Sequence, residues 1–174
     1  MKKIAMLAVL LAVSFVMKAQ DYQYIQNDSV EDGVRLVSTT AIPIITNQGV
    51  SAMGFTFSSN AEKEIYAVSI ITYAPQKWTI KKGDIAAFTM IEGANVYLPA
   101  YFDGECRIHK DNQYMISLTY EIPQSKIYDM LKALKRVTIN MKQTIDTSED
   151  IYIPFESAEM LMSAYLELLI ATGK

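Results

Sequence analysis

The feature that most constrains the fold is a series of short runs rich in Val, Ile, Thr, Tyr and Phe, separated by turn residues. Within 50–57 and again within 113–122, successive residues alternate between two faces, as in a half-buried antiparallel strand. Two hairpins are expected, one joining 34–45 to 50–57 and one joining 85–91 to 95–101. A further tight hairpin is expected to turn at Asp103-Gly104.

The periodicity changes after Pro123. Apolar residues then recur at the i, i+3, i+4, i+7 spacing of an amphipathic helix, at Ile127, Met130, Leu131 and Leu134. A final helix is expected over about 157–171, with Ser157 as its N-cap. The pattern therefore predicts an α+β fold. We expect a mainly antiparallel sheet of about seven to eight strands, with two C-terminal helices packed on one face.

Residues 1–20 have the three parts of a secretory signal peptide. Lys2 and Lys3 precede an uncharged apolar run over 4–17, which is short for a bilayer span, and Ala19-Gln20 offers the cleavage point. Because no Cys lies near the signal, a lipoprotein is not expected. We expect one domain over 21–174, periplasmic or secreted, with 21–33 as a loosely ordered lead-in or a weak first strand, and no later transmembrane segment.

The charge of the expected mature chain disfavours nucleic acids as partners. Without Lys2, Lys3 and Lys18, 13 of the 16 Lys and Arg residues remain against 19 Asp and Glu, a net charge of −6. Nucleic-acid binding requires clustered cations, so it is not expected. Cys106 is the only cysteine, which leaves core packing alone to hold the fold. The sequence does not indicate an oligomeric state.

No catalytic motif or cofactor signature is present. Cys106 and His109 are three residues apart on an expected strand, so their side chains should point to opposite faces. Two such ligands are also too few for a zinc site. The carboxylates of Glu31-Asp32 and Glu149-Asp150 are interpreted as solvated turns. We therefore expect no catalytic residues, no cofactor and no metal.

Aromatic and methionine side chains are the candidates for a binding surface. The chain has eleven Tyr and one Trp, which suit stacking on sugars or an interface, although packing between strands is the commoner use. If such a surface exists, Trp78 with Tyr73 and Tyr97 is the candidate. Met160 and Met162 on the last helix are either core residues or an adaptable docking face.

Three segments resemble small exported domains of unknown function from Gram-negative gut and oral anaerobes. They are Trp78-x-Ile80-x-Lys82-Gly83-Asp84 with the hairpin to Tyr101, the strand 114–122, and the expected helix with Lys135-Arg136-Val137-Thr138-Ile139 after it, and together they span about 60 residues. The resemblance implies the same class of envelope protein and carries over no catalytic residue. Asp28-Ser29-Val30 also resembles an O-glycosylation acceptor of exported proteins in these bacteria, which would place the glycan on Ser29.

The sequence favours a non-enzymatic binding or interaction domain whose partner is an envelope protein or a carbohydrate. The alternative is a small hydrolase of envelope polymers, polysaccharides or peptides, with a carboxylate site that the spacing does not reveal.

Overall fold

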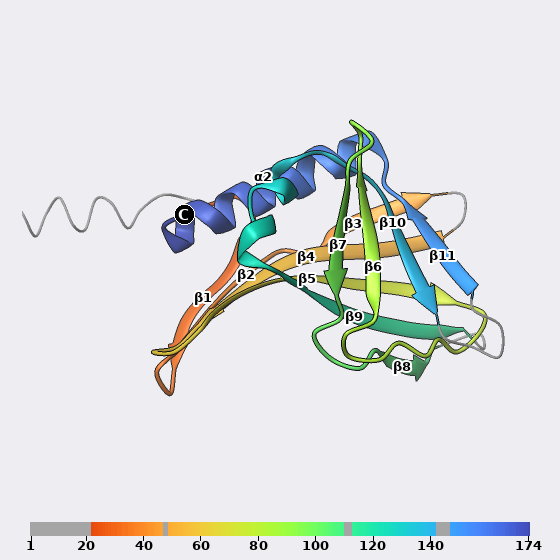
Figure 1. Ribbon diagram of the computed structural model, residues 1–174, viewed down its shortest axis with the longest axis horizontal. Helices are drawn as coiled ribbons and strands as arrows, with labels where there is room; N and C mark the ends of the chain where they lie inside the picture. The colour runs from red at the N-terminus through yellow and green to blue at the C-terminus, as the bar shows by residue number, and fades with distance from the viewer. Residues whose placement is uncertain (1–21, 47–48, 110–112, 142–146) are drawn as a thin grey trace, which may run out of the picture.

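The computed structural model describes residues 22–46, 49–109, 113–141 and 147–174. They form two antiparallel sheets and a C-terminal helix (Figure 1). The large sheet has seven strands in the order β1-β2-β4-β5-β9-β8, with β3 pairing the other half of β4. Its strands are β1 (Ile25–Glu31), β2 (Val34–Thr39), β3 (Ile42–Thr46), β4 (Gly49–Ser59), β5 (Glu64–Ala74), β8 (Glu105–Ile108) and β9 (Tyr114–Ile122).

The small sheet has four strands in the order β11-β10-β6-β7. They are β6 (Ile85–Met90), β7 (Asn95–Pro99), β10 (Leu134–Met141) and β11 (Thr147–Tyr152). Along one side the two sheets are joined, because Ala100 bridges to Tyr120 and the Tyr101 amide donates to the Thr119 carbonyl at 2.8 Å. On the other side, the edge strands β3 and β11 have no recorded pairing with each other among the described residues.

The helix α2 (Phe155–Thr172) packs mainly on β2 and β4 of the large sheet. Figure 1 shows it running along the large sheet beside the small sheet. The core between the sheets and under the helix is continuous and includes Val68, Phe88, Tyr120 and Leu168, all nearly inaccessible to solvent. The large apolar area removed from water there is the main stabilising contribution, since the described residues contain no disulfide.

The expectation of a single sheet covered by two C-terminal helices is wrong. In place of the first helix there are two short 3-10 turns, η2 (Gln124–Lys126) and η3 (Asp129–Leu131), and Leu134 already belongs to β10. Ile127, Met130 and Leu134 are buried as the periodicity indicated. A 3-10 turn places residues i and i+3 on one side, which accounts for Ile127 and Met130. Leu134 points inward from the start of β10, so burial at this spacing did not require a helix.

Two local expectations also differ from the structure. The strand β8 pairs with β9 of the large sheet, not with β7, so Asp103-Gly104 is not a hairpin turn. Gly104 lies so close to the core that a Cβ atom there would be 2.7 Å from Leu118 Cδ2. The helix α2 starts at Phe155 after Pro154, and the Ser157 hydroxyl donates to the Pro43 carbonyl at 3.0 Å instead of capping the helix.

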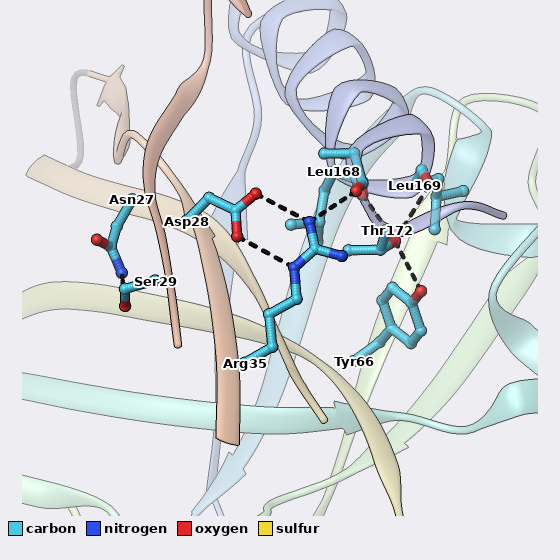
Figure 2. A network of polar contacts seen from close by, with 9 residues as sticks. Asn27, Asp28, Ser29, Arg35, Tyr66, Leu168, Leu169 and Thr172 are labelled. Carbon is cyan, nitrogen blue, oxygen red and sulfur yellow. Dashed lines mark hydrogen bonds and ion pairs between the residues drawn. The ribbon is translucent and has the colours of Figure 1, made fainter. Parts of the chain in front are cut away.

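Polar contacts fix the C-terminal end of α2 to the sheet (Figure 2). The guanidinium of Arg35 donates to both carboxylate oxygens of Asp28, at 3.1 and 2.8 Å, and to the Ala171 carbonyl at 3.0 Å. The Thr172 hydroxyl lies 2.8 Å from the Tyr66 hydroxyl. Arg35 therefore links β1, β2 and the helix terminus in one network.

Candidate ligand-binding cleft between the two sheets

A cleft of about 190 Å³ lies where β11 faces β3 and the adjoining ends of β4 and β5. This is the side of the molecule on which the two sheets are not joined by strand pairing in the described residues. The side chains and backbone that line it come from four strands and the segment after β5. They include Ile44, Thr46, Ser51, Thr72, Ala74, Trp78, Glu149, Ile151 and Tyr152.

The inner face of the large sheet changes from apolar to polar at the cleft. Along β4 the inward residues Phe57, Phe55 and Met53 are buried hydrophobics, and the next inward residue is Ser51. Along β5, Val68 and Ile70 are followed by Thr72. Because side chains alternate along a strand, Ser51 and Thr72 occupy core-facing positions although both are polar.

The two hydroxyls form the floor of the cleft and bond to each other. Ser51 and Thr72 are 8% and 6% exposed, and their oxygens lie 2.8 Å apart across paired strands. Two hydroxyls carry two protons, and one hydrogen bond uses one of them. One proton and several lone pairs therefore remain for water or a ligand group in the cleft, since an unpaired buried donor is costly.

The carboxylate of Glu149 lies across the cleft from the two hydroxyls, on β11. On β11, Glu149 lies on the same face as buried Ile151, toward the large sheet, and its side chain is exposed at the cleft. The structure records no ion pair or hydrogen bond for the Glu149 side chain with any described residue. The cleft therefore contains a negative charge that the described residues do not neutralise.

Asp150, the next residue, also borders the cleft, but its carboxylate is held on the other face of β11. Its carboxylate accepts from the Thr138 hydroxyl at 2.6 Å, from Arg136 Nη1 at 3.2 Å and from the Tyr152 hydroxyl at 3.4 Å. These three donors come from β10 and β11, so they belong to the outer surface of the small sheet. Asp150 and Glu149 therefore have different environments although they are adjacent in sequence.

Of the three aromatic residues proposed from the sequence, Trp78 and Tyr73 line the cleft and Tyr97 does not. Trp78 is only 4% exposed, so its ring is a wall of the cleft and part of the core. The Tyr73 ring lies 5.0 Å from the ring of His109. Tyr97 is on β7 of the small sheet, paired with Ala87 and 59% exposed. The structure thus does not bring the three together.

The other proposed residues lie away from this cleft. Met160 and Met162 are both 37% exposed on α2, where they flank the surface turned from the sheet. Met162 lines a small hollow of about 10 Å³ together with Lys132 and Leu134. Ser29 is half-buried on the edge strand β1, and its hydroxyl accepts from Asn27 Nδ2 at 3.1 Å (Figure 2).

The described residues offer little for metal or thiol chemistry. They contain no group of three or more His, Cys, Asp or Glu side chains arranged to hold a metal ion. Cys106 packs partly buried against the core, whereas His109 is exposed against Tyr73. A thiol activated by an imidazole would require direct contact between the two, which this arrangement does not provide.

The sequence analysis does not identify Ser51 or Thr72, and its interpretation of Glu149-Asp150 as a turn is wrong, because both residues lie on β11. The signal for Ser51 was visible, because it continues the alternating face of Met53, Phe55 and Phe57 with a hydroxyl. A polar residue on the otherwise apolar face of a strand indicates a candidate ligand contact. Its partner Thr72 and the facing Glu149 could not be found in this way, because strand pairing over long sequence separations brings them together.

Comparison with family models, curated proteins and solved structures finds no match for this chain. None of the helices in the described ranges combines the length and hydropathy required to cross a bilayer.

Proposed function

We propose that this protein is an exported, non-enzymatic binding domain, periplasmic or secreted, and that the cleft between β11 and β3 holds a small polar group of its ligand. The observation that carries the proposal is the hydroxyl pair of Ser51 and Thr72 at core-facing positions. Buried polar groups on an apolar face reduce stability relative to well-packed apolar residues, so their presence at a cleft favours a binding role.

Binding is favoured over hydrolysis by the chemistry of the lining residues. The Ser51 hydroxyl contacts Thr72, which is not a general base. Glu149 and Asp150 are consecutive on a strand, so their carboxylates point to opposite faces and do not flank one bond. The hydrolase alternative would therefore need a second acid from elsewhere in the chain.

The single tryptophan offers a direct test. Trp78 is the only Trp in the chain and lines the cleft, so its fluorescence should report an occupant of the cleft. Residues 21–174 would be titrated with panels of basic, acidic and neutral peptides and of oligosaccharides. The proposal predicts a saturable change in Trp78 emission with one class, and no turnover of that ligand.

The matched variants use two hydroxyl pairs of the same sheet. Ser51→Ala/Thr72→Val should weaken binding by about tenfold or more, equivalent to about one lost hydrogen bond to a buried group. Ser69→Ala/Thr119→Val removes a second cross-strand pair, 3.1 Å apart on the other face, and should leave binding unchanged. Equal effects of the two double variants, or no saturable ligand in any panel, would refute a role for the cleft.

Export is tested separately. In a Gram-negative host, cell fractionation should place the chain in the periplasm or the medium, with an N-terminus near residue 21 by mass spectrometry. Recovery of the uncleaved chain in the cytoplasm would contradict this part of the proposal.

A further inference from the structure

We propose that the group bound in the cleft is a cation, namely the ammonium or guanidinium of a basic peptide side chain. This inference rests on the proposed function and names the ligand class of the same cleft. Its starting point is Glu149, a carboxylate on the inward face of β11 with no recorded ion-pair partner among the described residues. Of the described residues lining the cleft, none is a Lys or an Arg.

On the neighbouring strand β10, Arg136 is already engaged by other groups. Arg136 Nη1 lies 3.2 Å from Asp150 Oδ2, and the guanidinium carbon lies over the Tyr152 ring, 6.0 Å from its centre. Asp150 and Tyr152 both belong to the face of β11 opposite Glu149. Arg136 is therefore oriented to compensate Asp150, and the charge of Glu149 is left to attract a ligand.

The hydroxyl floor complements a cation as well. An ammonium group has three protons to donate and no lone pair, and the oxygens of Ser51 and Thr72 have unused lone pairs. The remaining hydroxyl proton can be donated to water or to a carbonyl oxygen of the peptide backbone. A carboxylate at one wall and hydroxyl acceptors at the floor are the partners that a desolvated cation requires.

The burial of Trp78 disfavours a sugar in the same place. A sugar ring stacks on an exposed aromatic face, but Trp78 is 4% exposed and the Tyr73 ring is directed at His109. The Tyr152 ring is 44% exposed, but it belongs to the face of β11 opposite Glu149 and lies near Arg136. The volume of about 190 Å³ is below the range typical of sites for whole small molecules. One side chain inserted from a peptide or protein therefore fits the cleft better than a sugar chain.

The net charge of −6 expected for the mature chain also favours a cationic ligand. A negative field raises the association rate of cationic ligands, and this contribution falls as salt screens it. The affinity of a basic peptide should therefore decrease with ionic strength, while that of a neutral ligand should change little.

The test compares peptides of matched shape. Residues 21–174 would be titrated with a blocked peptide containing one lysine, with the same peptide carrying norleucine, and with its acetyl-lysine form, using Trp78 emission and calorimetry. The lysine peptide should bind about tenfold or more tightly than either neutral form at low salt, as expected for one charge-assisted contact. Equal affinity of the three peptides would overturn the inference.

Two carboxylate variants locate the effect. Glu149→Gln should lower the affinity for the lysine peptide by about tenfold and reduce its salt dependence. Glu159→Gln makes the same change of charge at an exposed position of α2 and should leave the affinity unchanged. If Glu159→Gln weakens binding as much as Glu149→Gln, the effect is one of net charge and the cleft assignment fails.

The outcomes separate this inference from the proposed function. Binding of a neutral oligosaccharide that is lost in Ser51→Ala/Thr72→Val but kept in Glu149→Gln would retain the binding cleft and overturn the cationic ligand. Absence of binding by every peptide and oligosaccharide would overturn both.

Discussion

The hydroxyls of Ser51 and Thr72 lie 2.8 Å apart on paired strands, at the point where the core between the sheets becomes a cleft. On the core side of this pair lie Met53 and Ile70, which are fully buried. On its other side lie the cleft and the exposed carboxylate of Glu149. The pair thus separates the part of the interior that stabilises the fold from the part available to a ligand.

Removing both members of this pair should cost less stability than the two single removals added together. Ser51→Ala leaves the Thr72 hydroxyl buried without its partner, so we expect the free energy of unfolding to fall by about 1–2 kcal/mol. Ser51→Ala/Thr72→Val removes both polar groups and should be closer to the wild type than the sum of the single variants. Urea unfolding of the four proteins measures this coupling; additive effects would mean that the hydroxyls act independently.

Tyr165 should tolerate loss of its hydroxyl. Its side chain is fully buried, with its ring centre 4.7 Å from that of Phe55, and its hydroxyl has no hydrogen-bond partner in the described structure. Burial raises the pKa of this phenol above its usual range. Tyr165→Phe removes an unsatisfied polar group, so the free energy of unfolding should stay unchanged or rise by about 1 kcal/mol.

The matched control for Tyr165 is Tyr66. Its hydroxyl lies 2.8 Å from the Thr172 hydroxyl, so Tyr66→Phe should lower the free energy of unfolding by about 1 kcal/mol. Equal destabilisation by Tyr66→Phe and Tyr165→Phe in urea unfolding would show that the Tyr165 hydroxyl has a partner.

Glu167 should hold the start of the chain against α2. Its carboxylate accepts from the backbone amides of Gln23 and Tyr24, at 3.2 and 2.7 Å. Glu167→Ala should speed hydrogen exchange at these two amides and lower the free energy of unfolding by about 1 kcal/mol, because both bonds are charge-assisted but partly exposed. Glu159→Ala, on the exposed surface of α2, should leave exchange at the two amides unchanged. The same protection in both variants would contradict this role.

The stability contributed by the contact between Lys81 and Asp103 should decrease as the pH falls. The Lys81 ammonium, 2.8 Å from the carboxylate, and the Lys82 amide at 2.9 Å lower the pKa of Asp103 below its usual value. Because the pKa of Asp103 is lower in the folded than in the unfolded protein, its ionised form stabilises the fold. This stabilisation is complete above the unfolded pKa, near 4, and is lost as the pH falls through the folded pKa.

The carboxyl titration of Asp103 by NMR measures this shift. The midpoint in the wild type should lie below that of Asp in an unfolded peptide, and Lys81→Met should raise it toward that value, because the side-chain bond to Lys81 is its largest cause. A midpoint that Lys81→Met leaves unchanged would assign the shift to the backbone amide of Lys82.

Much of the local strand structure could be predicted from alternation and turn residues. The hairpin expected over 85–91 and 95–101 corresponds to β6 and β7, and the strand expected over 113–122 corresponds to β9. These segments combine period-two burial with clear turns, so local information was sufficient. The assignment of strands to two sheets was not predictable, because it depends on pairings such as β8 with β9 that the residues near Gly104 do not specify locally.

The first strand shows the same limit. Residues 25–31 contain few apolar side chains and are mostly exposed, which is why the segment was expected to be loosely ordered or at most a weak strand. The structure has β1 there, paired with β2 and supported by Arg35 and Glu167. Arg35 lies on the neighbouring strand and Glu167 lies on α2, far along the chain. The pattern of apolar residues within 25–31 therefore could not indicate either contact.

We propose the cleft between β11 and the ends of β3, β4 and β5 as the ligand site. The most direct test is an NMR map of backbone amide shifts in residues 21–174 on titration with the lysine peptide. We expect saturable shifts concentrated at Ser51, Thr72, Glu149 and Ile151, with the amides of Met160 and Leu166 on α2 unaffected. Shifts concentrated on α2 instead, with the four cleft residues unchanged, would contradict it.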